Sequence, residues 1–325
     1  MSRRTLLQIE AARPTQRAFL LLMLFLVLLR TSSAQNNTLD VSADATRSPA
    51  VAGAHKSLKA YHEGNIRDID AIGNRDVGCE RGLASRYSLE EQVELGRSLA
   101  RAMDATFALV TDPVITGYIN RIGQDLAQNS DAQVPFAFAV IQNKAANAMS
   151  LPGGFVFVDS GLILAADNEA ELAGALSHEI GHIAACHAAQ VMAREELANN
   201  NTSMPLMFRI ASRRMTASTV YVKPTVFEAE ADLLGLQYLY KTGYDPQALP
   251  SLFERIKAVQ KQRPSNPAKA SEFHSQLSDR AEKARHEIDS LLPPAAEYKL
   301  DTSEFQDIKQ RLSKLQDRHE HLTLK

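Results

Sequence analysis

The 325-residue chain has little cysteine, no excess of positive charge and only one long apolar run. Its cysteines are Cys79 and Cys186, so it is not a disulfide scaffold, although the two could form one bridge. No CxxC or other paired-cysteine zinc motif occurs. We interpret Cys186 as a small, buried apolar residue. No internal repeat is visible, which argues against a solenoid or propeller.

The charge balance argues against nucleic acid as a partner. Residues 1–34 contain five arginines and one glutamate. Without them the chain keeps 31 basic and 37 acidic residues, a formal net charge of −6 instead of −2. A mildly acidic protein lacks the basic surface that binding to phosphate groups requires.

Residues 1–34 are typical of a secretory signal peptide. Arginines precede an apolar run from Ala18 to Leu29, and small polar residues follow it up to Ala34. We therefore expect an exported protein, with cleavage after Ala34. Twelve apolar residues are too few to span a bilayer comfortably, but an uncleaved membrane anchor is the alternative.

The segment Ser177-His178-Glu179-Ile180-Gly181-His182 combines two metal-ligand candidates with a base. His178 and His182 are four residues apart, so they lie on one face of a helix and can reach one metal ion. Glu179 lies beside them and suits a general base that takes a proton from a metal-bound water. A chance pair of histidines on a polar helix face is the alternative. The apolar helical pattern from Asn168, a candidate N-cap, to about Leu197 favours the metal site.

The rest of the chain predicts an α+β fold that is mostly helical, with a small antiparallel sheet beside the helix that carries His178 and His182. We expect 1–34 as signal peptide, 35–87 as a linker and N-terminal extension, 88–292 as the metallopeptidase domain and 293–325 as an amphipathic helical tail. Alternating apolar residues predict short strands at 135–141, 147–151 and 155–158. Helical spacing and capping signals predict helices over 88–103, 111–128, 225–242, 245–256, 275–292 and 303–317. The uneven stretch 199–224 is interpreted as a lid or plug.

A catalytic zinc usually has three protein ligands and one open position. The spacing after His182 excludes the metzincin and thermolysin arrangements, because no ligand stands at the required distances. Glu228-Ala229-Glu230-Ala231-Asp232 is the next candidate. Glu228 and Asp232 share a helix face, so one could bind zinc while the other holds an imidazole. A capping role for Glu228 is the alternative, and we expect Glu230 to be solvated.

These motifs resemble the zinc metallopeptidase family of HtpX, BepA and the CAAX prenyl endopeptidase, in its bacterial periplasmic, BepA-like branch. The resemblance covers about residues 88–290 and includes HEIGH, EAEAD, the segment 147–162 and Gly243-Tyr244-Asp245-Pro246. It implies a zincin-like fold with one Zn²⁺ per chain, Glu228 as third ligand and Asp232 as its supporting residue. The chain lacks the later membrane spans of the multi-spanning members and a recognisable tetratricopeptide array.

The same resemblance points to His274 and Arg280. BepA-like proteins carry a His–Pro pair that can cap the zinc, with an arginine six residues after the histidine. Here Ser275 replaces the proline. His274 is a candidate fourth, inhibitory ligand, or else an exposed loop histidine. Arg280 is a candidate for steadying the substrate or the oxyanion, and a surface ion pair is the alternative.

We therefore expect an exported zinc metalloendopeptidase of the periplasm or membrane-associated cell envelope, working in protein quality control. Its substrate would be a peptide or misfolded protein, held as an added strand near Asn147–Val158, although a purely structural hairpin there is the alternative. Outer-membrane or other envelope proteins are the expected partners. One rival hypothesis is a chaperone-like assembly factor with a capped, mostly latent zinc site; another is a metal-free helical scaffold.

Overall fold

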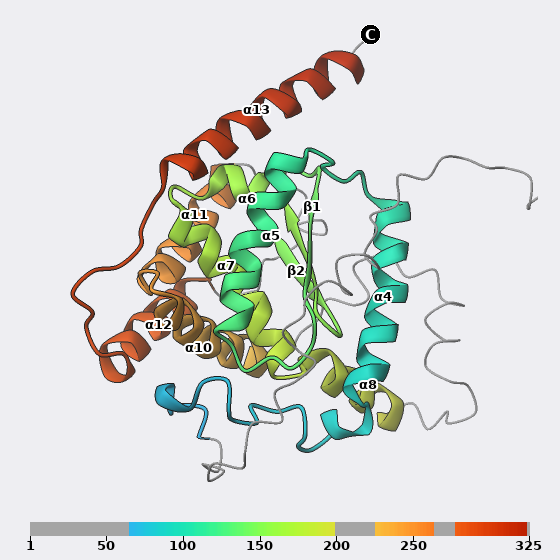
Figure 1. Cartoon of the computed structure of the whole chain (residues 1–325), viewed down its shortest axis with the longest axis vertical. Helices are drawn as coiled ribbons and strands as arrows, with labels where there is room; N and C mark the ends of the chain where they lie inside the picture. Colours follow the sequence, from blue (N-terminus) through green and yellow to red (C-terminus); the bar gives the residue numbers. More distant parts are fainter. Residues whose placement is uncertain (1–64, 199–224, 263–276, 324–325) are drawn as a thin grey trace, which may run out of the picture. The chain divides into compact units, whose positions relative to one another are not determined.

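The computed structural model describes residues 65–198, 225–262 and 277–323. The proposed signal peptide, the stretch 199–224 and His274 lie outside them. All described residues belong to one compact unit. Its elements (Figure 1) are the 3-10 helices η1 (Ile69–Ala71) and η2 (Ala84–Arg86), helices α4 (Leu89–Thr106), α5 (Pro113–Gln128), α6 (Ser160–Ala165), α7 (Glu169–Ala184), α8 (His187–Ala198), α10 (Thr225–Thr242), α11 (Ala248–Gln262), α12 (Leu277–Leu291) and α13 (Ser303–Thr323), and strands β1 (Ala137–Ile141), β2 (Ala148–Leu151) and β3 (Phe155–Asp159).

The three strands form a mixed sheet with the order β1-β3-β2. β2 and β3 are an antiparallel hairpin, whereas β1 pairs with β3 in parallel, Phe138 opposite Val156. The α+β expectation is confirmed, but the prediction of a wholly antiparallel sheet was wrong. β2 lies between β1 and β3 in sequence and runs in the opposite direction, so β3 has the same direction as β1.

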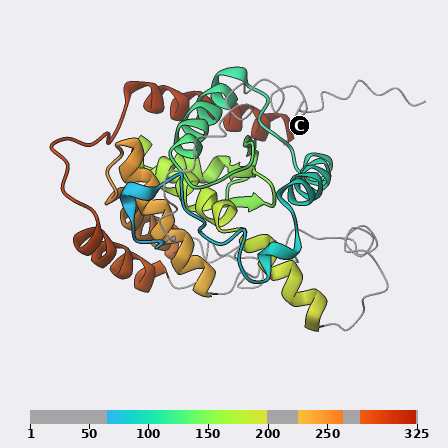
Figure 2. The same ribbon diagram turned by 60° about the horizontal axis from the view of Figure 1, so that its bottom comes forward.

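The sheet lies between two helical layers. Figure 1 and Figure 2 both place α4 beside one face, and α5 and α7 lie on the other. Successive side chains of a strand point to opposite faces of the sheet, so each strand contributes to both layers. Met149, Leu151 and Phe157 pack with α4 in the smaller core, whereas Val156 and Val158 join the main core of α5, α7, α10 and α11. Ser150 therefore points to the α7 side.

Local signals set several helix ends. Ser88 and Glu91 form the predicted capping box of α4, and Asp112 caps α5, which begins with Pro113. Asn168 accepts from the Glu171 N–H at 2.9 Å and so starts α7 as predicted. Gly243, with φ of +84°, ends α10.

The predicted single helix from 168 to about 197 is interrupted. α7 ends at Ala184 and α8 begins at His187. Cys186 lies between them with φ of +50°, a left-handed conformation that breaks the helix. Cys186 is buried among apolar residues as expected. It is also bonded to Cys79, which is the one bridge that the two cysteines could form.

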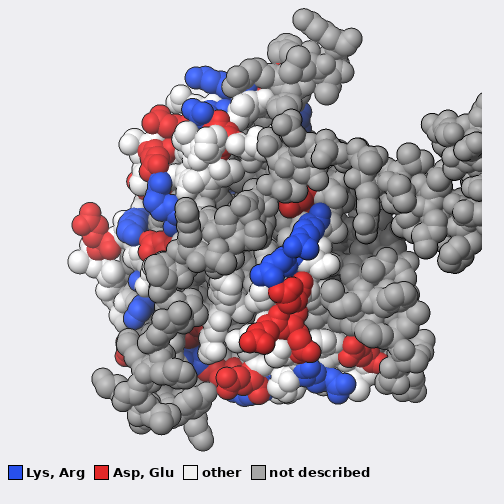
Figure 3. All heavy atoms as spheres, turned by 45° about the vertical axis from the view of Figure 1, so that its right-hand side comes forward, with Lys and Arg blue, Asp and Glu red and all other residues white. Residues whose placement is uncertain are grey.

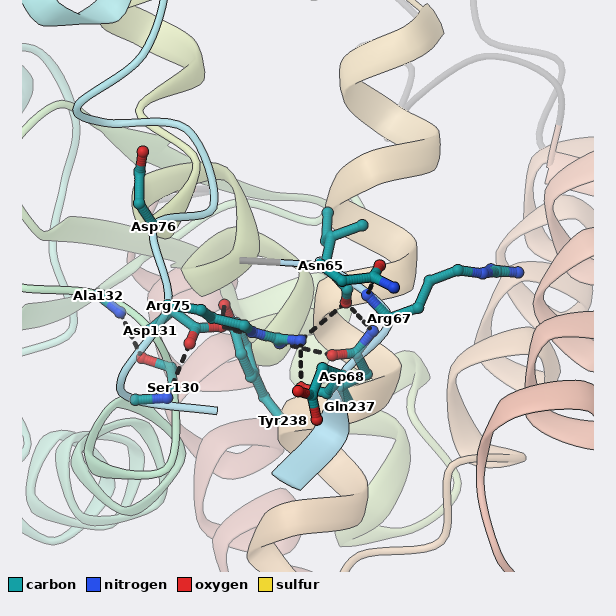
Figure 4. A network of polar contacts seen from close by, with 12 residues as sticks. Asn65, Arg67, Asp68, Arg75, Asp76, Ser130, Asp131, Ala132, Gln237 and Tyr238 are labelled. Carbon is teal, nitrogen blue, oxygen red and sulfur yellow. Dashed lines mark hydrogen bonds and ion pairs between the residues drawn. The ribbon is translucent and has the colours of Figure 1, made fainter. Parts of the chain in front are cut away.

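Residues 65–79 cross the outside of α10 and are fixed by a buried arginine (Figure 4). The Arg75 guanidinium pairs with Asp131 at 2.9 Å and donates to the Gln237 amide oxygen at 2.5 Å. It also donates to the carbonyls of Ile66 and Asp68, at 2.8 Å each. We call residues 65–79 the N-terminal strap. Arg75 connects this segment to α10, and Cys79 connects it to the turn between α7 and α8.

The tail helix α13 packs against α5 and α6 through Phe305, Ile308 and Leu312, as its apolar stripe predicted. Among the described residues, no helix is both long and apolar enough to cross a membrane. On the face shown in Figure 3, basic and acidic side chains lie next to one another. Ion pairs between such side chains include Arg121–Glu304 and Arg311–Asp112.

Candidate metal centre

Helix α7 carries His178, Glu179 and His182 into the interior. The exposed fractions of the three residues are 0%, 0% and 3%. Buried imidazoles and carboxylates are costly unless they find partners, so three of them on two turns of a core helix require an explanation.

The ligand candidates converge as the sequence predicted. The Nε2 atoms of His178 and His182 lie 3.1 Å apart. Glu228 on α10 places its carboxylate oxygens 3.6 Å from His178 Nε2 and 3.4 Å from His182 Nε2. Tetrahedral Zn²⁺ with bonds of about 2.0–2.1 Å requires ligand atoms about 3.3–3.4 Å apart. The donor types and spacings fit zinc.

Asp232 holds His178 from the side away from these donors. Its Oδ1 lies 2.9 Å from His178 Nδ1, so the imidazole donates from Nδ1 and keeps Nε2 for a metal. Burial alone would raise the pKa of Asp232, but the charge and hydrogen bonds of Arg280 and the contact with His178 hold it below its usual value. Asp232 is therefore an anion at neutral pH.

Arg280 on α12 is a buried partner of these carboxylates. It donates to Asp232 through Nε at 2.7 Å and Nη2 at 2.6 Å, and its Nη1 lies 3.4 Å from Glu228. Its guanidinium also lies 4.3 Å from the centre of the Phe253 ring. Because Arg280 is 5% exposed, the alternative of a surface ion pair was wrong.

His182 is held by a residue that sequence reasoning did not select. Its Nδ1 lies 2.8 Å from Nδ1 of His187, the first residue of α8. His187 Nε2 in turn lies 3.2 Å from a Glu230 carboxylate oxygen. The expectation that Glu230 is simply solvated was therefore wrong: its side chain is 31% exposed and has a buried histidine as partner.

The base candidate Glu179 contacts the sheet. Ser150 on β2 donates its hydroxyl proton to Glu179 Oε2 at 2.6 Å. The alternation of β2 could have indicated this contact, since Ser150 is the polar residue on the strand face that turns toward α7.

Two glycines allow α7 and α10 to approach closely enough for Glu228 to reach the histidines. A Cβ on Gly181 would lie 2.9 Å from the Ala231 carbonyl oxygen, and one on Gly235 would lie 3.0 Å from the His178 nitrogen. Both distances are below normal contact, so a larger residue would force the helices apart.

The chain is similar to several known proteins. The model of Peptidase family M48 matches residues 113–288. The chain is 29% identical to the beta-barrel assembly-enhancing protease of Yersinia pestis over 67% of its own length and 48% of that protein. It is 30% identical to the Escherichia coli K12 protein of the same name, over 67% and 47%. Mitochondrial metalloendopeptidase OMA1 of Schizosaccharomyces pombe is 28% identical, over 58% and 56%.

The chain thus spans about half the length of the curated relatives it matches. The family model covers more than half of this chain, from α5 through most of α12. The matched range includes the candidate ligands His178, His182 and Glu228. It also includes Asp232 and Glu230, the α10 residues that contact His178 and His187. The resemblance drawn from HEIGH and EAEAD is confirmed: the chain belongs to peptidase family M48.

Proposed function

We propose that this chain is a zinc metalloendopeptidase whose single Zn²⁺ is held by His178, His182 and Glu228. The observation that carries the proposal is the convergence of one ligand atom from each residue within 4.8 Å. Two of these residues come from α7 and the third from α10, 46 residues later, so the arrangement is a product of tertiary packing.

The residues around the ligands have defined tasks in peptide hydrolysis. Bound zinc polarises the scissile carbonyl and lowers the pKa of the attacking water. Glu179 removes a proton from that water and passes it to the leaving amine nitrogen. Ser150 orients the Glu179 carboxylate through its hydrogen bond. Arg280 acts by positioning Asp232 and Glu228, because its guanidinium is already engaged by both carboxylates.

The substrate would be a peptide or misfolded protein segment that adds to the sheet at β2. β3 is the central strand and is paired on both edges. The outer edge of β1 is bonded to residues 108–110, for example Val110 N to Val140 O at 2.8 Å. In the described part of the chain, β2 is the remaining end strand, and its Ser150 contacts Glu179. A strand added there would pass the base, and main-chain hydrogen bonds would hold it whatever its sequence.

The setting we propose is the bacterial cell envelope, after export, with protein quality control as the task. Two relatives are named as proteases that enhance β-barrel assembly, which makes envelope proteins the expected partners. The Cys79–Cys186 disulfide also supports export, because such bonds persist in oxidising compartments.

Zinc content and cleavage of labelled casein test the proposal on the full chain. We expect about one zinc per chain and casein cleavage in the wild type. Glu228→Ala should lose zinc, because only two ligands remain. Glu179→Gln should keep zinc and lose about 10²–10⁴-fold in rate, since the base is absent. Glu282→Gln, on the exposed side of α12, is the matched control.

Other outcomes separate the rival functions. A wild type that binds zinc but cleaves no faster than Glu179→Gln, with or without His274→Ala, would favour the chaperone-like binder. A wild type that takes up no zinc even when it is supplied would overturn the metallopeptidase proposal. Full zinc in Glu228→Ala would show that this glutamate is not a ligand.

A further inference from the structure

We propose that His187 and Glu230 are positioning residues of the metal centre, which hold His182 as Asp232 holds His178. The inference rests on the zinc site proposed above and deepens it. It assigns a role to a histidine outside the HExxH motif and to the middle acid of the Glu228–Asp232 segment.

The break between α7 and α8 brings His187 to His182. On a continuous helix, a residue five positions later would lie about 140° round the axis from His182. The left-handed Cys186 turns the chain instead, and the two imidazole centres lie 5.0 Å apart at an interplanar angle of 73°. The disulfide to Cys79 fixes this turn covalently.

Burial and a stacking contact also fix the orientation of the His187 ring. It is 1% exposed, and its ring stacks on Phe227 with centres 4.3 Å apart and an interplanar angle of 14°. Phe227 is the residue before the ligand Glu228 on α10. The stacking contact therefore links the orientation of His187 to the helix that supplies the third ligand.

The proton positions in this chain of contacts follow from chemistry. If His182 binds metal through Nε2, its proton is on Nδ1, because a neutral imidazole carries only one. At 2.8 Å, one of the two facing Nδ1 atoms must donate and the other accept. His187 therefore accepts at Nδ1, carries its own proton on Nε2 and donates that proton to Glu230.

The result is a matched pair of supports from one helix. Asp232 holds His178 directly, and Glu230 holds His182 through His187. Such contacts fix the tautomer and the ring orientation of a ligand histidine, and their loss typically costs 10–100-fold in metal affinity. All three acids of the Glu228–Asp232 segment then serve the metal centre.

The competing explanation is that His187 is a core aromatic ring whose only task is to pack on Phe227. Two substitutions separate these roles. His187→Phe keeps a stacking ring but has no acceptor for the His182 Nδ1–H. His187→Asn loses the ring but keeps an acceptor, because its Oδ1 is as many bonds from Cα as the imidazole Nδ1.

The test is zinc affinity of the full chain, measured by competition with a chromophoric chelator at constant pH. The absorption spectrum of the Co²⁺-loaded protein gives a second readout of ligand geometry. We expect His187→Phe to bind zinc 10–100-fold more weakly and to change the Co²⁺ spectrum, since His182 is no longer oriented. His187→Asn should stay within a few-fold of the wild type. His286→Phe, on the exposed side of α12, is the control for an added phenylalanine.

Each outcome decides a different claim. Unchanged affinity in His187→Phe, or weaker binding in His187→Asn than in His187→Phe, would overturn this inference while the zinc site stands. A wild type that binds no better than Glu228→Ala would overturn the zinc site itself. If His187→Phe does not fold, Glu230→Ala decides: several-fold weaker zinc binding supports the proposal, and wild-type affinity contradicts it.

Discussion

The environment of each carboxyl group determines its charge in this protein. Asp232 and Asp159 are both buried, at 6% and 3% exposure. Burial would raise the pKa of Asp232, but Arg280 keeps it below its usual value. Among the described residues, no cation pairs with Asp159, at the end of β3. Burial raises the pKa of Asp159 to about 7, and the hydrogen bond from Asn143 offsets this only in part. Asp159 is therefore a buried acid that titrates near neutral pH.

This difference predicts a pH-dependent stability. The folded state keeps a proton on Asp159 that the unfolded chain, with the usual value of 3.8, releases at lower pH. The stabilisation is complete below about pH 4 and is lost as the pH rises through about 7. Relative to Asp159→Asn, the wild type should lose unfolding free energy over this interval. Urea unfolding at several pH values measures it.

The control for the Asp159 experiment is Asp289→Asn, which changes an exposed aspartate on α12. Its pH profile should run parallel to that of the wild type. If the profiles of wild type and Asp159→Asn were also parallel from about pH 4 to 8, Asp159 would not retain the proton in the folded state.

Single residues also show how far sequence reasoning reaches. The spacing of His178, Glu179 and His182 is local, so a helix assumption placed them correctly. Glu228 needed the family resemblance, because its approach depends on the packing of two helices. His187 was missed, because it reaches His182 only after the left-handed turn at Cys186.

At the scale of elements, the crossing of α7 and α10 controls the centre. Gly181 and Gly235 remove the side chains that would separate these helices. Ala231 and Leu234, both with no exposed surface, fill the contact beside Gly181. The geometry of the candidate ligands is therefore a consequence of how closely two helical backbones approach.

Gly235→Ala should weaken both stability and zinc binding. Its new Cβ would lie 3.0 Å from the nitrogen and 3.1 Å from the Cα of His178, so the helices must move apart. We expect a loss of about 1–3 kcal/mol in unfolding free energy, typical of overpacking. Thermal or urea unfolding and chelator competition measure the two effects.

Gly117→Ala on α5 is the matched control for Gly235→Ala. A Cβ there meets no atom within 4 Å, and Gly117 is exposed. The change should stabilise the helix by up to about 1 kcal/mol and leave zinc binding unaltered. Equal effects of the two substitutions would contradict the close-packing explanation.

Helix starts and stops were predictable, whereas strand pairing was not. The caps at Ser88, Asp112 and Asn168 and the stop at Gly243 act within a few residues of the chain. The parallel pairing of β1 with β3 joins segments separated by a complete hairpin strand. No local pattern distinguishes that pairing from an antiparallel one. The direction of the pairing is therefore visible only in the folded structure.

At the scale of the whole molecule, the N-terminal strap joins parts of the chain that are far apart in sequence. Arg75 connects it to Asp131 and Gln237, and Tyr238 completes the group by donating to Asp131 at 2.9 Å. The Cys79–Cys186 bond then fixes the other end of the strap to the α7–α8 turn, across a sequence separation of 107.

Removal of the disulfide should destabilise the protein. The double substitution Cys79→Ser and Cys186→Ser frees a loop of about 100 residues in the unfolded state, which should cost about 2–5 kcal/mol. Urea unfolding of the oxidised wild type and the double variant measures this. A reducing agent should lower the stability of the wild type and leave the variant unchanged. Equal stability of the two oxidised proteins would show that the bond does not form.

The disulfide has another consequence when a protease cuts the chain. The closed loop from Cys79 to Cys186 contains the whole sheet and both histidines proposed as zinc ligands. A single backbone cut inside this loop leaves two pieces that are still joined covalently. A nicked molecule would migrate as one band without reductant and as two bands with it, so damage to the chain need not mean loss of its parts.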